Sequence, residues 1–213
     1  MARLLIATTN PAKLAEYRLL IYEMGLDLKL LSLADAGIHE HPEETGATFA
    51  DNAILKASFY FERARIATLA DDGGLEVDAL GGEPGVKSHR WLGPGRDNSD
   101  RALAGEVIAR MRDVPPERRS ARLRAAAALI YEENGAVRER IAEAAMEGVI
   151  AERVHSEMRP GFPYRAVLYL PDRGCYVGEL GEAEEARISQ RRTTVTMLAD
   201  DLRRIASAST ARL

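Results

Sequence analysis

The chain has 213 residues, of which 46% are apolar and 29% are charged, and its formal net charge is −4. This length suits one large domain, and such a chain buries enough surface to fold without a disulfide or a metal. The single cysteine, Cys175, excludes an internal disulfide and indicates a reducing compartment, so we expect a cytoplasmic protein. The acidic balance argues against binding to polymeric nucleic acid, and no apolar run reaches the ~18 residues of a membrane span.

The first third of the chain predicts strands that alternate with helices. The N-terminal residues lack the cleavage site of a signal peptide and fit a first strand. Asn10 is a good N-cap for the helix that follows, Pro11 suits its first position, and Gly25 suits its C-cap. The apolar pattern predicts, in chain order, a strand over 4–7, a helix over 11–24, a strand over 28–33, a polar loop over 37–47 and a long helix over 48–67.

The rest of the chain adds a hairpin to this pattern. A short strand over 68–70 is predicted to end on Asp71–Gly74, and Asn134-Gly135 is a strong hairpin signal. The alanine run at 125–128 leaves a helix open as the alternative there. The other predicted elements are a strand or turn over 75–80, a helix over 99–112, two long strands over 119–132 and 136–150, a strand over 166–170 and a helix over 191–206.

This order of elements predicts the fold class. Helices that cross between the early strands indicate an α/β fold, and the hairpin indicates a mixed sheet in place of a purely parallel one. No segment reads as a linker between domains. We therefore expect a single two-lobed domain over residues 1–206, followed by a frayed tail over 207–213.

A candidate phosphate site lies at Thr8–Lys13, where the first predicted strand meets the first helix. Backbone N–H groups and the positive end of the helix dipole point into such a gap. Thr8 and Asn10 add hydrogen-bond donors, and Lys13, one of only four lysines in the chain, adds a full charge. The alternative is a capped helix with an exposed lysine.

Two further groups of residues suit phosphate and metal chemistry. Asn52 and Lys56 lie four residues apart and so share one face of the helix that follows the acidic loop at Glu43–Gly46. Asp71 and Asp72 follow an apolar strand and offer the hard oxygen ligands that Mg²⁺ prefers. One carboxylate could bind a metal while the other orients or deprotonates a water. The alternatives are a solvated helix start and an Asp-Gly turn.

Two loops later in the chain suit nucleotide binding. A glycine-rich segment permits close approach of the backbone, and its Ser88 and Arg90 could contact phosphate or brace the carboxylates. Phe162 and Tyr164 form an aromatic pair that, exposed on a loop, can stack a base. A flexible loop and ordinary loop packing are the alternatives. Hydrogen-bond donors downstream are available from Gln190 and Arg191.

In order and spacing these groups resemble the inosine triphosphate pyrophosphatase family. The family patterns are Thr-x-Asn-x-x-Lys, Glu-Thr-Gly-x-Thr-Phe-x-x-Asn-Ala-x-x-Lys-Ala, Asp-Asp-Ser-Gly-Leu-x-Val-Asp-Ala-Leu and Gly-x-Pro-Gly-x-x-Ser-x-Arg. Gly73 stands in place of the family's serine. The matching segments are Thr8–Lys13, Glu44–Ala57, Asp71–Leu80 and Gly82–Arg90.

The resemblance implies an elongated mixed sheet with flanking helices in two lobes around a central nucleotide cleft, in a homodimer. It implies Mg²⁺-dependent hydrolysis of a nucleoside triphosphate to the monophosphate and pyrophosphate, which cleans the nucleotide pool. By the family pattern, Asp72 is the general base on the attacking water, and Glu44, Asp71 and Asp72 place Mg²⁺. Lys13 and Lys56 hold and neutralise the triphosphate, whose negative charge otherwise opposes attack by water. The implied substrate-binding residues are Thr8, Thr9, Asn10, Lys13, Gly73, Ser88, Arg90, Phe162, Tyr164, Arg165, Gln190 and Arg191.

The chain departs from the family pattern in the part that reads the base. The family has Phe-Gly-Tyr/Trp-Asp-Pro where this chain has residues 162–166, so Arg165, a pure donor, replaces a carboxylate. The family's Ser-His-Arg is Ser189-Gln190-Arg191 here, and the lysine expected shortly upstream is missing from Glu184–Arg187. A register shift of a residue or two would instead bring Asp172 or Glu179 near the pocket. We predict an active pyrophosphatase whose preference for ITP and XTP is weakened or redirected.

Two other functions stay open at this point. The chain could be a nucleotide-binding sensor or scaffold without turnover, although the intact carboxylates and lysines count against that. It could also act by the same chemistry on a different or modified base, which the altered Arg165 and Gln190 favour.

Overall fold

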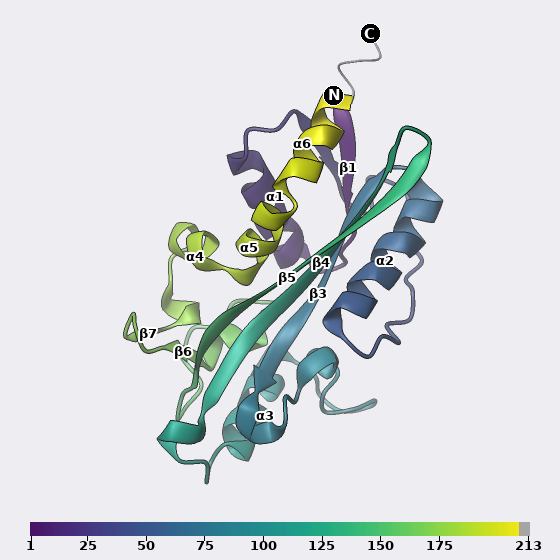
Figure 1. Cartoon of the computed structure of the whole chain (residues 1–213). Coiled ribbons are helices and arrows are strands. Elements are labelled where there is room, and N and C mark those ends of the chain that lie inside the picture. Colours follow the sequence, from purple (N-terminus) through teal and green to yellow (C-terminus); the bar gives the residue numbers. More distant parts are fainter. Residues whose placement is uncertain (209–213) are drawn as a thin grey trace. The chain divides into compact units, whose positions relative to one another are not determined.

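The computed structural model describes residues 1–208 (Figure 1). Its strands form one seven-stranded sheet within these residues, in the order β2-β1-β3-β4-β5-β6-β7. The strands are β1 (Ala2–Ile6), β2 (Leu28–Leu31), β3 (Ala67–Val77), β4 (Ser120–Glu133), β5 (Ala136–Ile150), β6 (Leu168–Leu170) and β7 (Cys175–Tyr176). The helices are α1 (Pro11–Glu23), α2 (Phe49–Ala64), α3 (Asp100–Arg110), α4 (Glu182–Ile188), α5 (Gln190–Met197) and α6 (Ala199–Ala208).

Two compact units divide the chain, and three strands contribute residues to both. The first unit contains residues 1–72, 125–144 and those from 191 onward, and the second contains residues 73–124 and 145–190. Strand β1 pairs in parallel with β2 and β3, whereas β6 pairs antiparallel with β5 and β7. The predicted α/β class and the mixed sheet are therefore confirmed. The nucleotide cleft expected between two lobes stays a prediction.

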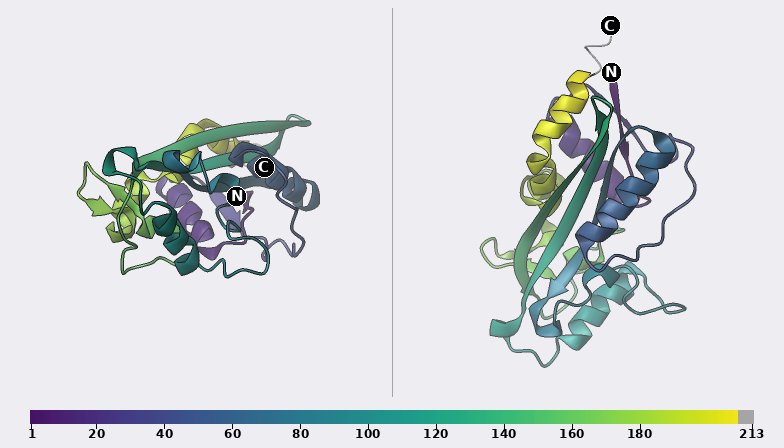
Figure 2. Two further views of the ribbon diagram at one scale, coloured as in Figure 1. Left: turned by 90° about the horizontal axis from the view of Figure 1, so that it is seen from below. Right: turned by 45° about the vertical axis from the view of Figure 1, so that its right-hand side comes forward.

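Each unit has its own core. In the first unit, α2 covers one face of the sheet, and α1, α5 and α6 lie against the other face (Figure 2). Buried apolar side chains of β1, α1 and α2 fill the space between, among them Leu5, Tyr17 and Phe49. In the second unit, α3 packs into a cluster of buried side chains that includes Leu103 and Val167.

The local signals placed most of the early elements correctly. The side chain of Asn10 caps α1 by accepting two backbone N–H groups of the first turn, and Gly25 follows the helix with a φ of +65°. Thr48 caps α2 as half of a capping box. Asn134 and Gly135 have φ values of +52° and +77°, so they form the predicted hairpin turn between β4 and β5.

The predicted end of this strand at Asp71–Gly74 is wrong, and so is the alternative of an Asp-Gly turn, because β3 runs without interruption from Ala67 to Val77. Aspartate and glycine are poor strand formers, but packing decides strand formation more than intrinsic preference does. A Cβ at Gly74 would lie 1.9 Å from Ser88 Oγ, so glycine is needed for the Ser88 side chain to pack here. Both aspartate side chains also find buried partners, described below. The strand therefore continues where its local sequence predicts its end.

The C-terminal helix predicted over 191–206 is two helices, α5 and α6, separated at Leu198. The hydroxyl groups of Thr194 and Thr196 donate to carbonyls one turn back, a contact that bends helices. Helix α4 and the short strand β7 were not predicted. The alanine run at 125–128 lies fully buried in β4, so the helical alternative there is wrong.

Helix α6 extends to Ala208, so Ser207 and Ala208 do not belong to the predicted frayed tail. The remainder of that prediction, residues 209–213, lies outside the described residues. Within residues 1–208, no helix is both long and apolar enough to cross a membrane.

Candidate active site

The loop that leads into α1 begins at the carboxyl end of β1. The N–H of Ala7 donates to a carbonyl of β3 at 2.8 Å, which fixes where the chain leaves the sheet. The Asn10 N–H then donates to Thr8 Oγ1 at 3.2 Å, and Asn10 Oδ1 accepts from the Lys13 N–H at 3.3 Å. Thr9 is exposed. This loop lies at the strand end where α/β proteins bind ligands, and Thr8 and Asn10 also hold the turn itself.

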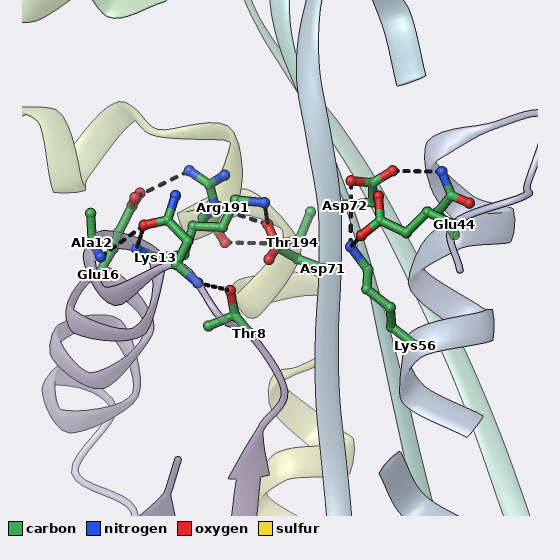
Figure 3. A network of polar contacts seen from close by, with 12 residues as sticks. Thr8, Ala12, Lys13, Glu16, Glu44, Lys56, Asp71, Asp72, Arg191 and Thr194 are labelled. Carbon is green, nitrogen blue, oxygen red and sulfur yellow. Dashed lines mark hydrogen bonds and ion pairs between the residues drawn. The ribbon is translucent and has the colours of Figure 1, made fainter. Parts of the chain in front are cut away.

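Asp71 lies on the α1 side of β3 in a buried cluster of charges (Figure 3). Its Oδ2 lies 3.2 Å from Lys13 Nζ and 3.0 Å from Arg191 Nε, and Arg191 Nη1 lies 3.2 Å from Glu16 Oε2. Burial alone would raise the pKa of the Asp71 carboxyl, but the Lys13 and Arg191 cations outweigh it and hold that pKa far below its usual range. Burial lowers the pKa of the Lys13 ammonium, and the Asp71 charge offsets this only in part.

Asp72 lies on the α2 side of β3, in a second cluster (Figure 3). Its Oδ2 accepts from Asn52 Nδ2 at 2.9 Å, and its Oδ1 lies 3.4 Å from Lys56 Nζ. The same ammonium lies 2.9 Å from Glu44 Oε1. Asn52 is fully buried, and its Oδ1 accepts from the Gly46 N–H at 2.8 Å. One amide therefore ties the loop that carries Glu44 to the carboxylate of Asp72.

The carboxylates of this cluster stabilise the positive charge of Lys56. Burial alone would lower the pKa of its ammonium, but the carboxylates of Asp72, Asp71 and Glu44 outweigh burial and raise that pKa. Lys56 therefore stays a cation at neutral pH.

The structure separates the three carboxylates predicted to place a metal. Asp71 and Asp72 are consecutive residues of a strand, so their side chains leave opposite faces of the sheet. Glu44 lies with Asp72, and both contact the ammonium of Lys56. The assignment of Asp71 and Asp72 to one metal came from the family resemblance and stays a prediction, whereas the continuous strand directs the two side chains to opposite faces.

Glu44 and Asp72 fit a magnesium ion without Asp71. Mg²⁺ is commonly held by one or two carboxylates together with waters and substrate phosphates, so a cage of several protein ligands is not required. Accordingly, the part of the chain that the structure describes has no cluster of three or more metal-binding side chains. The two carboxylates are hard oxygen donors that already share one cation, which is the donor chemistry that this ion needs.

Ser88 and Tyr164, predicted to bind substrate, are buried in the core of the second unit. The hydroxyl of Ser88 donates to the Gly85 carbonyl at 2.7 Å and accepts from the Leu75 N–H at 3.1 Å. Tyr164 is 3% exposed and donates to the Ser88 carbonyl at 2.5 Å. The expectation of an exposed aromatic pair is thus wrong for Tyr164, because the ring fills the core and its hydroxyl has a backbone partner.

The other residues predicted to bind substrate have varied environments. Phe162 is partly exposed, and the guanidinium carbon of Arg165 lies 3.5 Å from the centroid of its ring. Arg90 is exposed, Gln190 is buried at the start of α5, and Gly73 is buried in β3. Substrate contacts for these residues stay predictions.

Three polar residues of these clusters had no role assigned from the sequence. Asn52 was placed only on the same helix face as Lys56, and that spacing was the available signal. Glu16 follows Lys13 by one helical turn, so it shares a face with it. Glu185, the partner of Arg165, had no local signal, because its contact joins helix α4 to a segment about 20 residues earlier in the chain.

Together, the fold and these two clusters define an α/β protein with paired carboxylates on the middle of β3 and lysines beside them, next to the carboxyl end of the parallel strand β1, a site suited to anionic phosphate ligands. The sequence model of the Ham1 family matches residues 4–201, and the chain belongs to this family.

Individual relatives match nearly the full length of the chain. It is 39% identical over 199 residues to a dITP/XTP pyrophosphatase of Geobacillus kaustophilus, with 93% of each chain covered. It is 38% identical over 213 residues to a dITP/XTP pyrophosphatase of Mycolicibacterium paratuberculosis, covering 98% of this chain and 99% of the relative. A HAM1 protein from Coxiella burnetii has a similar structure, with a TM-score of 0.81, 31% identity and coverage of 95% and 98%. The family resemblance seen in the sequence is therefore confirmed.

Proposed function

We propose that this chain hydrolyses non-standard purine nucleoside triphosphates, such as ITP, dITP and XTP, to the monophosphate and pyrophosphate, with Mg²⁺ as cofactor. The observation that carries the proposal is the carboxylate of Asp72, held between Asn52 and Lys56 and joined to Glu44 through the same ammonium. The names of the two relatives, dITP/XTP pyrophosphatase, support the choice of substrate.

Asp72 is the general base of the proposed reaction. Its Oδ2 is engaged by Asn52, whereas its Oδ1 faces Lys56 at the longer distance of 3.4 Å and retains capacity to accept a proton. As the water oxygen bonds to phosphorus, its proton passes to Asp72, and the bond to the departing pyrophosphate breaks.

Lys13 and Lys56 neutralise the triphosphate in this proposal. Each is buried beside a carboxylate, so each cation is already oriented before the substrate arrives. Preorganised charges of this kind stabilise the negative charge that develops during phosphoryl transfer. Glu44 and Asp72 would hold Mg²⁺, which when bound supplies further neutralisation of phosphate oxygens.

Asp71 does not act as the base in this proposal; it positions Lys13 and Arg191. Its carboxylate contacts both cations and lies across the strand from the base. The homodimer, the cytoplasmic location and the set of substrate contacts stay predictions of the sequence.

Release of pyrophosphate with Mg²⁺ tests the proposal. The panel contains ITP, dITP, XTP, the four common ribonucleotides, their deoxy forms and dUTP, with Asp72→Asn as the inactive control. We expect ITP, dITP and XTP to be hydrolysed fastest, and removal of Mg²⁺ by a chelator to stop the reaction. Binding without turnover would favour a nucleotide sensor. Dominance of another base would favour the same chemistry on a different substrate.

Replacing Asn52 with leucine is expected to lower kcat by about 10- to 100-fold, because the Asp72 carboxylate loses a hydrogen bond of the charged type. The KM should change far less, because the lysines that hold the phosphates are untouched. Steady-state kinetics and a melting curve measure both effects.

The matched control for Asn52 is Thr48→Ala, which breaks the capping box at the start of the same helix without touching Asp72. It should cost about 1 kcal/mol of stability and leave kcat unchanged. Equal kcat losses in the two variants would show that Asn52 acts only through the stability of α2.

A further inference from the structure

Residues 40–46 lie along α2 in the first unit, in the loop that leads into this helix (Figure 2). Their contacts fall on residues of α2 that follow one another at intervals of three or four. The pairs are Gly46 with Asn52, Glu44 with Lys56, His41 with Tyr60 and Glu40 with Arg63. Helix residues at this spacing share one face, so this segment, called the strap below, runs antiparallel to α2 along one face of it.

The contact between His41 and Tyr60 attaches the strap to the core. The Nδ1 atom of His41 lies 3.0 Å from the hydroxyl oxygen of Tyr60. Tyr60 is 2% exposed, so packing fixes its ring. Burial also raises the pKa of the tyrosine hydroxyl, which therefore keeps its proton at neutral pH and can donate to a neutral imidazole. The buried hydroxyl is thus a fixed attachment point for the strap.

Glu44 lies between this attachment and a second one. Shortly after Glu44 in the chain, the Gly46 N–H donates to Asn52 Oδ1 at 2.8 Å. His41 precedes Glu44, and the intervening Pro42 has a fixed φ that removes one backbone rotation. The backbone that carries Glu44 is therefore held on both sides.

The ion pair of Glu44 with Lys56 does not by itself fix this carboxylate. The Glu44 side chain is 31% exposed, and an ion pair open to solvent contributes little because water and salt screen it. A metal ion that had to order the loop itself would bind less tightly, because ordering a segment costs free energy at the moment of binding. The attachments of the strap remove part of that cost before the ion arrives.

We propose that Tyr60 and His41 are positioning residues, which hold the strap so that the Glu44 carboxylate faces Asp72 and the two carboxylates bind a divalent cation together. Neither positioning residue lies in the segments that match the family pattern. They determine how tightly the cation binds and leave the chemical step unchanged. This inference rests on the proposed function, because it takes Glu44 and Asp72 as the ligands of Mg²⁺.

Removing the tyrosine hydroxyl tests the inference. Tyr60→Phe keeps the buried ring and removes only the attachment of His41. We expect the dissociation constant of Mg²⁺, measured by calorimetry, to rise by about three- to tenfold, the effect of one net hydrogen bond. At saturating Mg²⁺ the kcat should stay within about twofold, and the melting temperature should fall by less than about 3 °C. A merely structural role would lower the melting temperature without this change in Mg²⁺ affinity.

Hydrogen exchange gives a readout that needs no metal. The Gly46 N–H is bonded to Asn52, so its exchange rate in the metal-free protein reports how firmly the strap is held. We expect this rate to rise in Tyr60→Phe by a similar factor of about three to ten.

Variants of His41 test whether the two residues act through one contact. His41→Ala should weaken Mg²⁺ binding as much as Tyr60→Phe does, and the double variant should bind no more weakly than either single variant. His41→Asn keeps a hydrogen-bond acceptor close to the position of Nδ1, so it should restore binding to within about twofold of the wild type. Effects that multiply in the double variant would overturn the assigned contact.

The matched control is Glu40→Gln, at the neighbouring position of the strap. Glu40 Oε2 lies 3.2 Å from Arg63 Nε in an exposed ion pair, which contributes little. Its Mg²⁺ affinity and its Gly46 exchange rate should match those of the wild type. Equal weakening in Glu40→Gln would overturn the role given to His41 and Tyr60, and so would a wild-type Mg²⁺ affinity in Tyr60→Phe.

Titration of Mg²⁺ into the protein alone, and into the protein with the α,β-methylene analogue of ITP, separates this inference from the proposed function. If the wild type binds Mg²⁺ but hydrolyses no nucleotide, weaker binding in Tyr60→Phe supports the inference while the proposed function fails. If the wild type hydrolyses ITP and Tyr60→Phe binds Mg²⁺ like the wild type, the proposed function stands and the inference fails. Absence of Mg²⁺ binding in both titrations of the wild type would overturn both.

Discussion

Asp72→Asn is expected to lower the rate of pyrophosphate release by about 10²- to 10⁴-fold, the contribution typical of a positioned general base. Asparagine has nearly the same shape as aspartate, but it cannot take a proton from water. Asparagine is also neutral, so Lys56 loses its ion pair with residue 72 and keeps the one with Glu44. Both the chemistry and the charge balance of the site therefore change, while the packing is kept.

The control for Asp72→Asn is the same substitution at Asp78, just after β3. Asp78 binds Ser120 and Arg122 near the surface and has no place in the proposed site. Rates and melting curves for both variants give the comparison. A variant at Asp72 that kept more than about a tenth of the wild-type rate would exclude this residue as the base.

Asp71→Asn is expected to destabilise the fold by about 3–5 kcal/mol, the usual cost of removing one partner from a buried ion pair. Lys13 and Arg191 would then lie buried and close together without the carboxylate between them. For a chain of this length, the melting temperature should fall by about 6–20 °C. Mg²⁺ binding, measured by calorimetry, should persist, because Asp71 lies across the strand from Glu44 and Asp72. Loss of Mg²⁺ binding at unchanged stability would instead make Asp71 a metal ligand.

The Asp71 cluster also predicts how stability depends on pH. The pKa of this carboxyl is lower in the folded protein than its ordinary value of 3.8, so the folded state favours the ionised form. The stabilisation is therefore complete above about pH 4 to 5 and is lost as the pH falls towards the native pKa. Between neutral pH and about pH 3, the wild type should lose more unfolding free energy than Asp71→Asn. Equal losses in urea titrations would contradict the assigned ion pairs.

The sequence could predict those features that depend on neighbouring residues. Asn10 and Thr48 are helix caps whose partners lie two or three positions away, so the pattern alone located α1 and α2. The hairpin turn depends on Asn134 and Gly135 in the same way. The resemblance to the family located most of the charged residues of both clusters, because each lies within or beside a matching motif, but it did not locate Glu16.

The remaining features depend on contacts between distant segments. That the side chains of Asp71 and Asp72 leave opposite faces of the sheet follows from the continuation of β3, where Gly74 leaves room for the Ser88 side chain. The pairing of Arg165 with Glu185 joins residues 20 positions apart, as the hydrogen bond of Asn52 to Asp72 also does. Local propensity carries no information about such pairs.

The products formed from ITP with Mg²⁺ test the central claim most directly. Anion-exchange chromatography of a complete reaction separates IMP and pyrophosphate from IDP and phosphate. We expect IMP and pyrophosphate in equal amounts, and neither product with Asp72→Asn. Formation of IDP and phosphate, or the absence of any turnover by a folded wild-type chain, would contradict the proposed reaction.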